Sequence, residues 1–265
     1  MTLAARSALI GYTGFVGGNL LSAAPWTDCY NSKNIETLAG RSYDLVVCAG
    51  VSAVKWKANK DPQGDWAGIQ PLLDALAQVR AKRFVLISTI DVYPLPVLVD
   101  EDCAPDAQTC HPYGSHRFKI EQFVRQHFEN ALIVRLPGMF GPGLRKNAIY
   151  DLLTNNQVEL VDPDACFQFY HVGWTWADIE RAGQLGLNLL NLSTEPVSMQ
   201  QVAQQAFGRT LPTREQAHPR YDFRSKHASS WGGRDGYLYE AAQVLAAMSA
   251  WVQVERASGG GNPCA

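Results

Sequence analysis

The stretch ALIGYTGFVGGNLL, residues 8–21, decides the fold of this chain. It begins as an apolar strand, passes through glycines spaced G-x-x-G-x-x-G, and continues as a helix with leucines on one face. Backbone amides at a helix N-terminus point at an anion, and the helix dipole favours negative charge there. In this pattern Gly11 allows the tight turn, Gly14 lets the backbone approach a pyrophosphate, and Gly17 lets helix and strand pack closely. The spacing predicts a phosphate-binding corner, although such glycines also occur in plain loops.

Composition narrows the class of protein. The chain has 265 residues, enough for one large α/β domain or one and a half smaller ones. Hydrophobic residues make up 46% and charged residues 18%, as in ordinary globular proteins, and the net charge is −2. Nothing in this balance suggests a basic footprint for nucleic acid, so we expect no nucleic-acid partner.

Export, membrane and metal signals are also missing from the sequence. No segment reaches the ~18 continuous apolar residues that span a bilayer, so we expect no membrane partner. Arg6 and Ser7 lead directly into the first strand, which argues against a signal peptide. The 6 cysteines show no C-x-x-C spacing and are expected to be reduced thiols of a cytoplasmic protein, with a Cys103–Cys110 pair as the alternative. We expect no metal site.

Strands and helices alternate along the first half of the chain. Continuous apolar runs, typical of strands covered on both faces, occur at 43–50, 83–89 and 131–136. A polar loop is predicted from 55 to 65, and a helix over 69–76 with Pro71 in its first turn or at a kink. This alternation predicts a doubly wound parallel α/β sheet with right-handed crossovers.

Beyond residue 143 the expected elements are shorter and richer in aromatic residues. We predict strands at 168–172 and 189–192, and helices at 176–187, at 198–207 with Ser198 as N-cap, and at 237–254. The dinucleotide-binding domain is predicted to span 1–142 and to be rejoined by about 166–195. A small substrate-binding region over 143–165 and 196–265 is expected to cap the sheet's carboxyl edge.

The end of the second predicted strand bears on the choice of cofactor. An acidic residue for the adenosine ribose often stands ~20 residues after the first glycine of such a corner. Here Asn31 occupies that place, and Lys33 follows closely. The missing acid weakens a strict preference for NAD and mildly favours a 2′-phosphate, while an ordinary solvated loop lysine is an equal alternative.

With these pieces placed, the chain resembles the extended short-chain dehydrogenase/reductase family of nucleotide-sugar epimerases, dehydratases and reductases. The resemblance covers about residues 7–207 and implies a Rossmann-type sheet. Its landmarks occur in the family's order: GYTGFVG at 11–17, CAG at 48–50, STIDVY at 88–93, YGSHRFKIE at 113–121, RLPGMFGPG at 135–143 and QFYHV at 168–172. The loop between Cys48 and Trp66 is loosely similar to the dTDP-4-dehydrorhamnose reductase branch.

The resemblance implies hydride transfer between a nicotinamide and a sugar carbon. Tyr113 matches the family's acid/base, Thr89 matches the hydroxyl residue that hydrogen-bonds the reacting oxygen, and Arg117 stands where the family has a lysine. A phenol with a pKa of ~10 is a poor base near neutrality until a nearby cation stabilises the phenolate. Tyr113 and Arg117 share a helix face at i and i+4, so their charges can meet.

Two positions depart from the family pattern. Arg117 keeps the positive charge of the lysine, but its planar fork cannot make the compact contacts of an ammonium group. Lys119 lies at i+6 from Tyr113, roughly on the opposite side of the helix. Asp65 stands where the family often has Asn near the cofactor, and an acid there could alter cofactor affinity. Alternatively, Tyr113 and Arg117 only stack on a helix surface.

The resemblance extends to further binding residues. We expect the cofactor, NAD or NADP, to be bound by Gly11, Thr13, Gly14, Phe15, Val16, Gly17, Asn31, Ala49, Gly50, Tyr113, Arg117, Pro137 and Met139. His171 matches a family position near the sugar, although a histidine in an aromatic strand is more often structural. Arg145 and Arg224 could meet a substrate diphosphate, because arginine forks suit phosphate oxygens.

Two functions remain open at this point. The first is an NAD(P)-dependent oxidoreductase or epimerase acting on a nucleotide-linked sugar, with Tyr113, Thr89 and Arg117 as its catalytic residues. The alternative is a catalytically impaired NAD(P)-binding protein that serves as a redox sensor or scaffold. Arg117 separates the two. A homodimer is possible by analogy with the family only.

Overall fold

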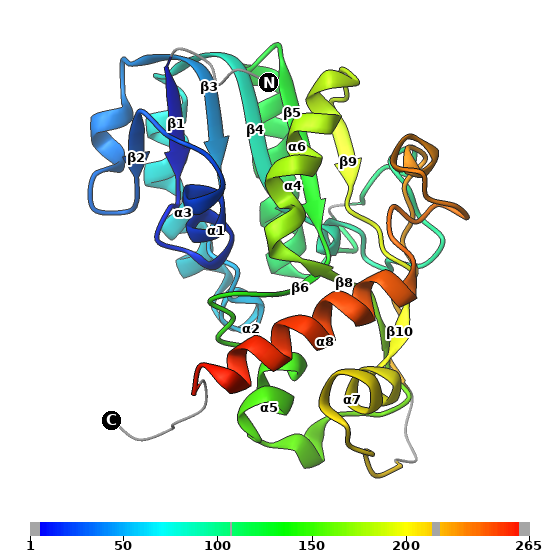
Figure 1. The fold of residues 1–265 in the computed structure, drawn as a ribbon. Coiled ribbons are helices and arrows are strands. Elements are labelled where there is room, and N and C mark those ends of the chain that lie inside the picture. The colour runs from blue at the N-terminus through cyan, green and yellow to red at the C-terminus, as the bar shows by residue number, and fades with distance from the viewer. Residues whose placement is uncertain (1–5, 107, 214–217, 260–265) are drawn as a thin grey trace. The chain divides into compact units, whose positions relative to one another are not determined.

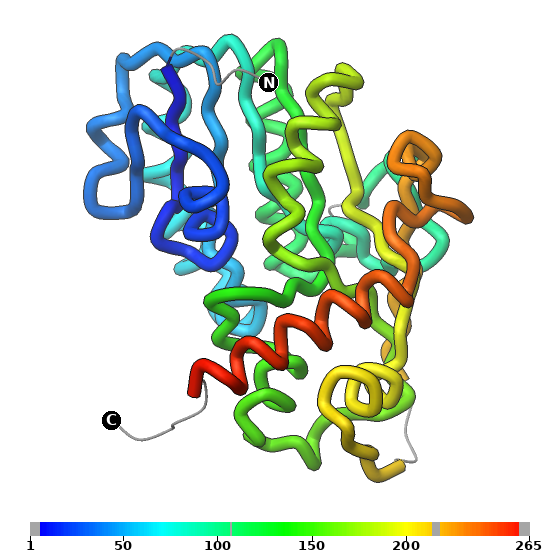
Figure 2. Tube along the Cα trace, in the orientation of Figure 1, coloured from blue at the N-terminus to red at the C-terminus, as the bar shows by residue number. Residues whose placement is uncertain are grey.

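The computed structural model describes residues 6–106, 108–213 and 218–259, and its chain divides into two compact units (Figures 1 and 2). The first unit comprises residues 1–95, 103–136 and 173–191. The second unit comprises residues 96–102, 137–172 and 192–265. The chain therefore passes more than once between the two units.

A six-stranded sheet forms the centre of the first unit, in the order β2-β1-β3-β4-β5-β9 with every neighbouring pair parallel. Its strands are β1 (Ser7–Ile10), β2 (Asp28–Tyr30), β3 (Ser42–Cys48), β4 (Arg80–Thr89), β5 (Ala131–Leu136) and β9 (Leu189–Asn191). The chain starts at β1 and moves outward in both directions, which confirms the predicted doubly wound α/β fold.

Helices cover both faces of this sheet (Figure 1). On one face lie α1 (Phe15–Ala23) and α6 (Thr175–Gln184), and Trp26, which follows α1, makes an edge-to-face contact with Trp176 of α6. On the other lie α3 (Pro62–Leu76) and α4 (Pro112–His127). Residues 8–10 of β1, 45–48 of β3 and 84–87 of β4 are apolar on both sides for this reason.

The core of the first unit lies between the sheet and the pair α3 and α4. Phe84 of β4 stacks on Phe128 with ring centroids 4.1 Å apart, and both are buried. Strand residues Val46 and Ile133 and helix residue Leu76 complete this cluster. Burying such side chains stabilises the fold by about 1.5–3 kcal/mol each.

The second unit contains short strands and three helices among its described residues. Strands β6 (Gly138–Phe140) and β8 (Phe169–His171) pair in parallel, and β7 (Cys166–Phe167) pairs with β10 (Val197–Ser198) in antiparallel fashion. The helices are α5 (Ala148–Thr154), α7 (Met199–Phe207) and α8 (Ala241–Ala257). Helix α7 begins with a capping box on Ser198, which confirms the predicted N-cap.

The sequence prediction was wrong in three places. Residues 55–65 are not a loop, because α2 (Lys55–Lys60) and the first turn of α3 occupy them. Helix α3 therefore starts earlier than predicted, capped by the Asp61 side chain, and Pro71 lies in its interior. The strand predicted at 168–172 is shorter in the structure, where only β8 (Phe169–His171) falls within it and Val172 begins a 3₁₀ turn, and the last helix begins at Ala241 rather than near residue 237.

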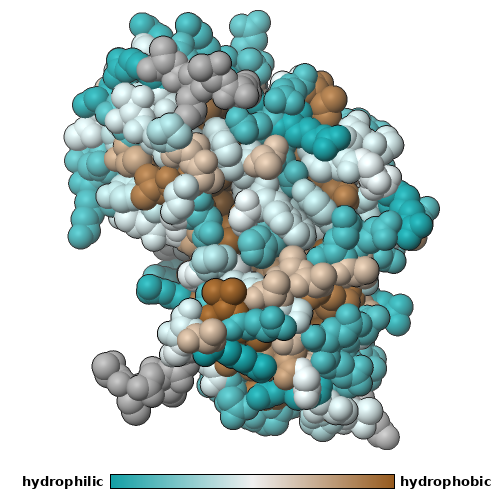
Figure 3. All heavy atoms as spheres, in the orientation of Figure 1, coloured by the Kyte–Doolittle hydropathy of each residue, from teal (hydrophilic) through white to brown (hydrophobic). Residues whose placement is uncertain are grey.

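None of the helices in the described ranges has the length and apolar character needed to cross a bilayer. In the view of Figure 3 the surface is mainly hydrophilic, with small separate apolar groups and a tan and brown area over α8. The cysteines within the described residues are free thiols, and Cys264 lies outside them.

Candidate active site

The glycine corner, residues 11–17, follows the carboxyl end of β1. Gly11 has a φ of +86°, in the left-handed region that glycine adopts without strain. Its amide donates to the carbonyl oxygen of Tyr30 at 2.7 Å, and a Cβ at this position would overlap the carbonyl group of Ala49. The first glycine is therefore held between the ends of β2 and β3, where no larger residue fits.

Helix α1 begins at this corner with its first amides facing outward. Gly14 is the N-cap residue, and no side chain caps the helix. Thr13 and Gly14 are exposed, whereas Gly17 is buried, and a Cβ on Gly17 would overlap the carbonyl oxygen of Gly11. First-turn N–H groups of a helix have no acceptor within it and carry the positive end of its dipole. The amide of Gly14 already donates to the carbonyl oxygen of Gly11 at 3.0 Å, so the amides of residues 15–17 are the ones that can donate to a phosphate oxygen.

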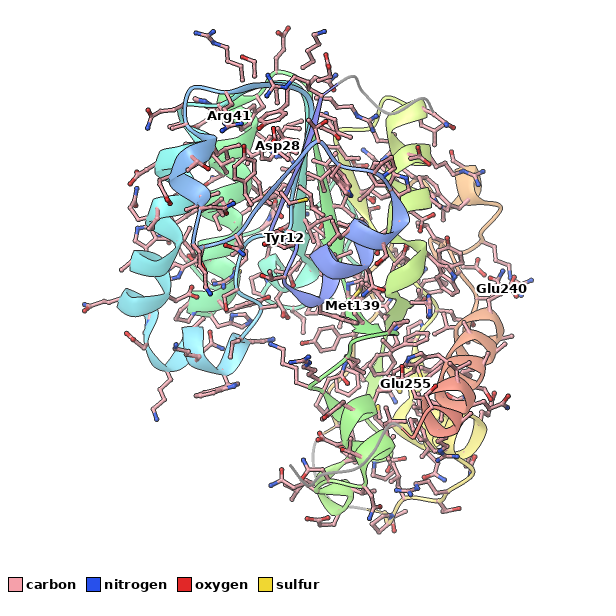
Figure 4. All side chains as sticks on the ribbon, turned by 60° about the vertical axis from the view of Figure 1, so that its left-hand side comes forward. Tyr12, Asp28, Arg41, Met139, Glu240 and Glu255 are labelled. Carbon is pink, nitrogen blue, oxygen red and sulfur yellow. The ribbon has the colours of Figure 1, made fainter. Side chains whose placement is uncertain are left out.

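Asn31 links the end of β2 to the glycine corner. Its Nδ2 donates to the Tyr12 hydroxyl at 3.2 Å, and its Oδ1 accepts from the amide of Lys33 at 2.8 Å. Figure 4 shows Tyr12 at the opposite end of the sheet from Asp28 and Arg41. Lys33 is exposed beside this link. The predicted ribose position thus holds an amide fixed in place and a nearby cation.

Small residues keep the neighbouring strand end open. Ala49 follows β3 and donates its amide to the carbonyl oxygen of Ile10 at 2.9 Å. Gly50 is exposed, and a Cβ there would lie 2.9 Å from the side chain of Ile10. Both residues border the glycine corner, as the sequence pattern predicts.

Tyr113 is placed by the beginning of α4. His111 caps this helix, with its Nδ1 accepting from the amide of Gly114 at 3.1 Å. The amide of Tyr113 itself donates to Asn59 Oδ1 of α2 at 3.0 Å. A Cβ on Gly114 would overlap the carbonyl oxygen of Asp91, so this glycine lets α4 start against the segment that follows β4.

Thr89, the last residue of β4, meets Tyr113 as predicted. Its side chain forms a hydrogen bond with the Tyr113 side chain and also accepts from the amide of Asp91 at 3.1 Å. Because Thr89 accepts the amide proton, its own hydroxyl proton is available to Tyr113. Burial raises the pKa of Tyr113, and Arg117 and Thr89 oppose that rise. Tyr113 is therefore a neutral phenol in the chain alone.

Arg117 contacts Tyr113 but is held by Asp65. Its Cζ lies 4.1 Å from the centroid of the Tyr113 ring, over the ring face. Nη1 donates to Asp65 Oδ2 at 2.5 Å, Nη2 to Asp65 Oδ1 at 3.1 Å, and Nη2 also to the carbonyl oxygen of Ser52. His116 Nδ1 lies 2.8 Å from the same carboxylate. The two departures from the family pattern thus form one ion pair.

A buried polar network joins α4 to β4 and β5. Arg135 of β5 binds Glu121 of α4 through Nε at 2.9 Å and Nη2 at 2.6 Å. Ser88 donates to Glu121 Oε1 at 2.6 Å, and Arg135 Nη1 donates to the Tyr93 hydroxyl at 2.6 Å. Both charged side chains are almost fully buried. This network fixes α4 to β4 and β5, the strands beside the site.

Three predicted residues lie in the β6 and β8 region of the second unit. Pro137 precedes β6, and Met139, nearly buried within it, accepts from Asn147 Nδ2 through its carbonyl oxygen at 2.9 Å. His171 ends β8, with its ring 5.2 Å from that of Phe140, and burial lowers its pKa. A histidine of lowered pKa is neutral near pH 7.

The two predicted substrate arginines differ in their surroundings. Arg145 is exposed. Arg224 pairs with Asp222 at 3.3 Å and lies over the Tyr237 ring, with its Cζ 5.2 Å from the centroid. It also lines a pocket of about 370 Å³ in the second unit, together with Lys226 and other residues.

One cluster in the second unit has the composition of a cation site. Asp162, Asp164 and His218 place ligand atoms within 4.8 Å of one another. His218 Nδ1 is 2.9 Å from Asp162, and Asp164 is exposed. Exposed acidic groups of this kind are common in proteins without a metal, so we assign the cluster no metal role.

Comparison with known families identifies the family to which this chain belongs. The model of the NAD dependent epimerase/dehydratase family matches residues 25–159, just over half of the chain. The chain belongs to this family. Helix α4 with Tyr113 and the Thr89 strand end lie within the match, whereas the glycine corner lies before it and is supported by its own geometry. Curated proteins gave no match to the sequence.

Solved structures of epimerases and reductases have the same fold. UDP-glucose 4-epimerase from Thermotoga maritima, solved with UDP-glucose, is 14% identical, with a TM-score of 0.68 over 96% of this chain and 99% of that one. UDP-glucuronic acid 4-epimerase from Bacillus cereus, solved with UDP-glucuronic acid and NAD, is 17% identical, with a TM-score of 0.67 over 94% of this chain and 99% of that one. dTDP-4-dehydrorhamnose reductase from Bacillus anthracis, solved with NADP, is 16% identical, with a TM-score of 0.72 over 94% of this chain and 98% of that one.

Sequence reasoning missed several residues around Tyr113. Asn59, Lys55 and Asp91 all reach the beginning of α4 or the end of β4, but the first two lie in a stretch predicted as loop. Glu121 of α4 pairs with Arg135 of β5, which no motif of the sequence predicted. The signal that was available is an arginine, Arg135, within an otherwise apolar strand, because a buried guanidinium needs a carboxylate partner such as Glu121.

Proposed function

We propose that this protein binds NAD or NADP at the glycine corner and transfers hydride on a nucleotide-linked sugar, with Tyr113 as acid/base. The observation that carries the proposal is the hydrogen bond between Thr89 and Tyr113, beside the guanidinium of Arg117. Family membership and neighbours solved with nucleotide sugars and NAD or NADP support it. The arrangement of Thr89, Tyr113 and Arg117 would suit either an oxidoreductase or an epimerase.

The residues of the first unit fit a dinucleotide. Gly14 and Gly50 are exposed glycines on adjacent segments, and α1 offers first-turn amides without a side-chain cap. Thr13, Phe15, Val16 and Gly17 would bind the pyrophosphate together with Gly14, and Asn31 the adenosine ribose. Ala49 and Gly50 would allow close approach, and Tyr113 and Arg117 would flank the nicotinamide end. We extend this assignment to Pro137 and Met139 from the family resemblance.

Tyr113 and Thr89 would act on one oxygen of the sugar. When bound, the nicotinamide supplies or accepts the hydride. In the reducing direction Tyr113, kept neutral by burial, donates its phenolic proton to the carbonyl oxygen as that oxygen gains charge. With the sugar bound, Thr89 would turn its single hydroxyl proton from Tyr113 to the same oxygen and orient it. In the oxidising direction Tyr113 must first lose its proton, which requires positive charge nearby.

A second function, NAD(P) binding without turnover, is favoured by one observation. Arg117 directs both terminal nitrogens at Asp65 and Ser52, and its Nε is buried without a hydrogen-bond partner. A guanidinium held in this way does not bring an N–H group to the Tyr113 hydroxyl as a mobile lysine can. The protein would then be a redox sensor or scaffold.

Tyr113→Phe separates the two functions. We expect the variant to lose turnover of nucleotide sugars by about 10²–10⁴-fold and to bind NAD(P)H normally, because only the transferred proton is removed. The measurement is NAD(P)H absorbance for net oxidation or reduction and chromatography of the sugar products for epimerisation, which regenerates its cofactor, with UDP-glucose, UDP-glucuronic acid and a dTDP-4-keto sugar, alongside the dinucleotide Kd.

Tyr150→Phe, a half-buried tyrosine of α5, is the matched control and should leave turnover unchanged. If the parent protein binds NAD(P)H but turns over none of the sugars, the sensor or scaffold function is supported. Mass spectrometry of any nucleotide that co-purifies tests binding and cofactor type together.

A further inference from the structure

Arg117 lies over the Tyr113 ring but is itself paired with Asp65. Its side chain is only 4% exposed and Asp65 only 9%, so their opposite charges are paired in a largely dry setting. Its contact with Tyr113 is across the ring face. The Arg117–Asp65 pair is neutral as a whole, and no N–H of its terminal nitrogens is assigned to the Tyr113 hydroxyl.

A second cation reaches the site from α2. Lys55 Nζ lies 2.8 Å from Asp91 Oδ1, and the lysine side chain is 40% exposed. Asp91 belongs to a 3₁₀ turn, residues 90–92, and its amide donates to Thr89. Asn59, one turn further along α2, accepts from the amide of Tyr113. Helix α2 therefore touches the site at both the β4 end and the α4 start.

Charged or titratable groups from four segments face Tyr113. Arg117 comes from α4, Lys55 from α2, Asp91 from the 3₁₀ turn, and His111 from the N-cap of α4, with its ring 6.1 Å from that of Tyr113. Burial is the largest cause of the raised pKa of Tyr113; Arg117 and Lys55 lower this pKa and Asp91 raises it. Removing Lys55 would take away the ammonium group that lies 2.8 Å from the Asp91 carboxylate, and the effect of Asp91 on the phenol would then increase.

We propose that Lys55 is a positioning residue of the Tyr113 site: it neutralises Asp91 and adds a second positive charge beside the phenol, on a side chain more flexible than Arg117, which is held by Asp65. An ammonium group on a flexible stem suits this role, because it can follow the charge that develops at the phenol. The expected effect on kcat rests on the proposed function. The expected effect on the Tyr113 pKa does not, because it can be measured without cofactor or substrate.

The electrostatic test uses 19F NMR of protein labelled with 3-fluorotyrosine, whose phenol titrates at lower pH than tyrosine. Tyr113→Phe assigns the Tyr113 signal. We expect Lys55→Met to raise the Tyr113 pKa and Asp91→Asn to lower it. Lys55→Arg should keep the parental value, as should Lys57→Met, an exposed lysine of the same helix. Circular dichroism shows whether each variant is folded.

The kinetic test follows the same variants. Lys55→Met should lower kcat for a nucleotide sugar on the order of tenfold with little change in KM, and Lys55→Arg should restore it. An unchanged Tyr113 titration in folded Lys55→Met, with a raised pKa in Arg117→Met, would overturn the inference. If the titration responds to Lys55 but no variant and no parent turns over sugar, the inference stands and the proposed function fails.

Discussion

Among single residues, Asp65 shows burial and hydrogen bonding acting in opposite directions. Burial alone would raise the pKa of its carboxyl group, but hydrogen bonds from Arg117 and His116 outweigh burial and lower it. Asp65 is therefore ionised at neutral pH despite its small exposure. A buried charge in this state depends on its partner, because its hydration has been given up.

Arg117→Met is expected to destabilise the protein by about 3–5 kcal/mol, because it leaves the Asp65 carboxylate nearly buried without its main partner. Adding Asp65→Asn should recover a large part of this loss, since the unpaired charge is then removed. Urea unfolding at pH 7 measures both variants. Arg80→Met, an exposed arginine of β4, is the control and should change stability by less than about 0.5 kcal/mol.

The pairing of these residues could not be predicted from the sequence. Asp65 and Arg117 each stand out as a departure from the family pattern, but 52 positions separate them. A helical face brings Tyr113 and Arg117 together through the i, i+4 rule, and a strand end brings Thr89 to the same edge; both follow from spacing. A contact between α3 and α4 depends on packing, which spacing does not encode.

At the scale of elements, two glycine-containing helix starts position the site. Gly17 lets α1 begin against the turn at Gly11, and Gly114 lets α4 begin against the carbonyl oxygen of Asp91. In both cases a backbone carbonyl occupies the space that a Cβ would need. The requirement is therefore steric and cannot be relieved by turning a side chain.

Gly17→Ala and Gly18→Ala make a matched pair in α1. Gly17→Ala should destabilise the protein by about 1–3 kcal/mol and weaken dinucleotide binding, because its Cβ meets the Gly11 backbone. Gly18→Ala should be neutral or stabilising by up to about 1 kcal/mol, because its Cβ would lie 3.6 Å from the nearest atom and alanine favours helix. Thermal unfolding and the dinucleotide Kd measure both. Equal effects of the two substitutions would contradict the steric role of Gly17.

Element prediction succeeded where a pattern spans many residues. The runs at β3, β4 and β5 are apolar because both faces are covered, and the sequence shows that directly. Helix α2 has only six residues, with Ala58 alone buried, so its amphipathic signal is too weak to read. Missing α2 in the sequence also meant missing Lys55, the lysine of α2 that pairs with Asp91 beside the candidate site.

At the scale of the whole molecule, the candidate residues are divided between the two units. The glycine corner, Asn31, Ala49, Gly50, Thr89 and the α4 residues all belong to the first unit. Pro137, Met139, Arg145, His171 and Arg224 belong to the second. The short strands of the second unit depend on pairing between distant segments, such as Val197 with Phe167, which local sequence patterns do not reveal.

This division predicts how the molecule responds to a dinucleotide. At 100 times its Kd, NAD(H) or NADP(H) should stabilise the folded chain by about 2.7 kcal/mol and raise the unfolding temperature. Hydrogen exchange should slow most in the first turn of α1, whose amides have no acceptor within the helix, and at the ends of β2 and β3. Adenosine, which lacks the pyrophosphate, should leave α1 unprotected. Protection confined to the second unit, with none at Gly14 to Gly17, would contradict the glycine corner as the binding site.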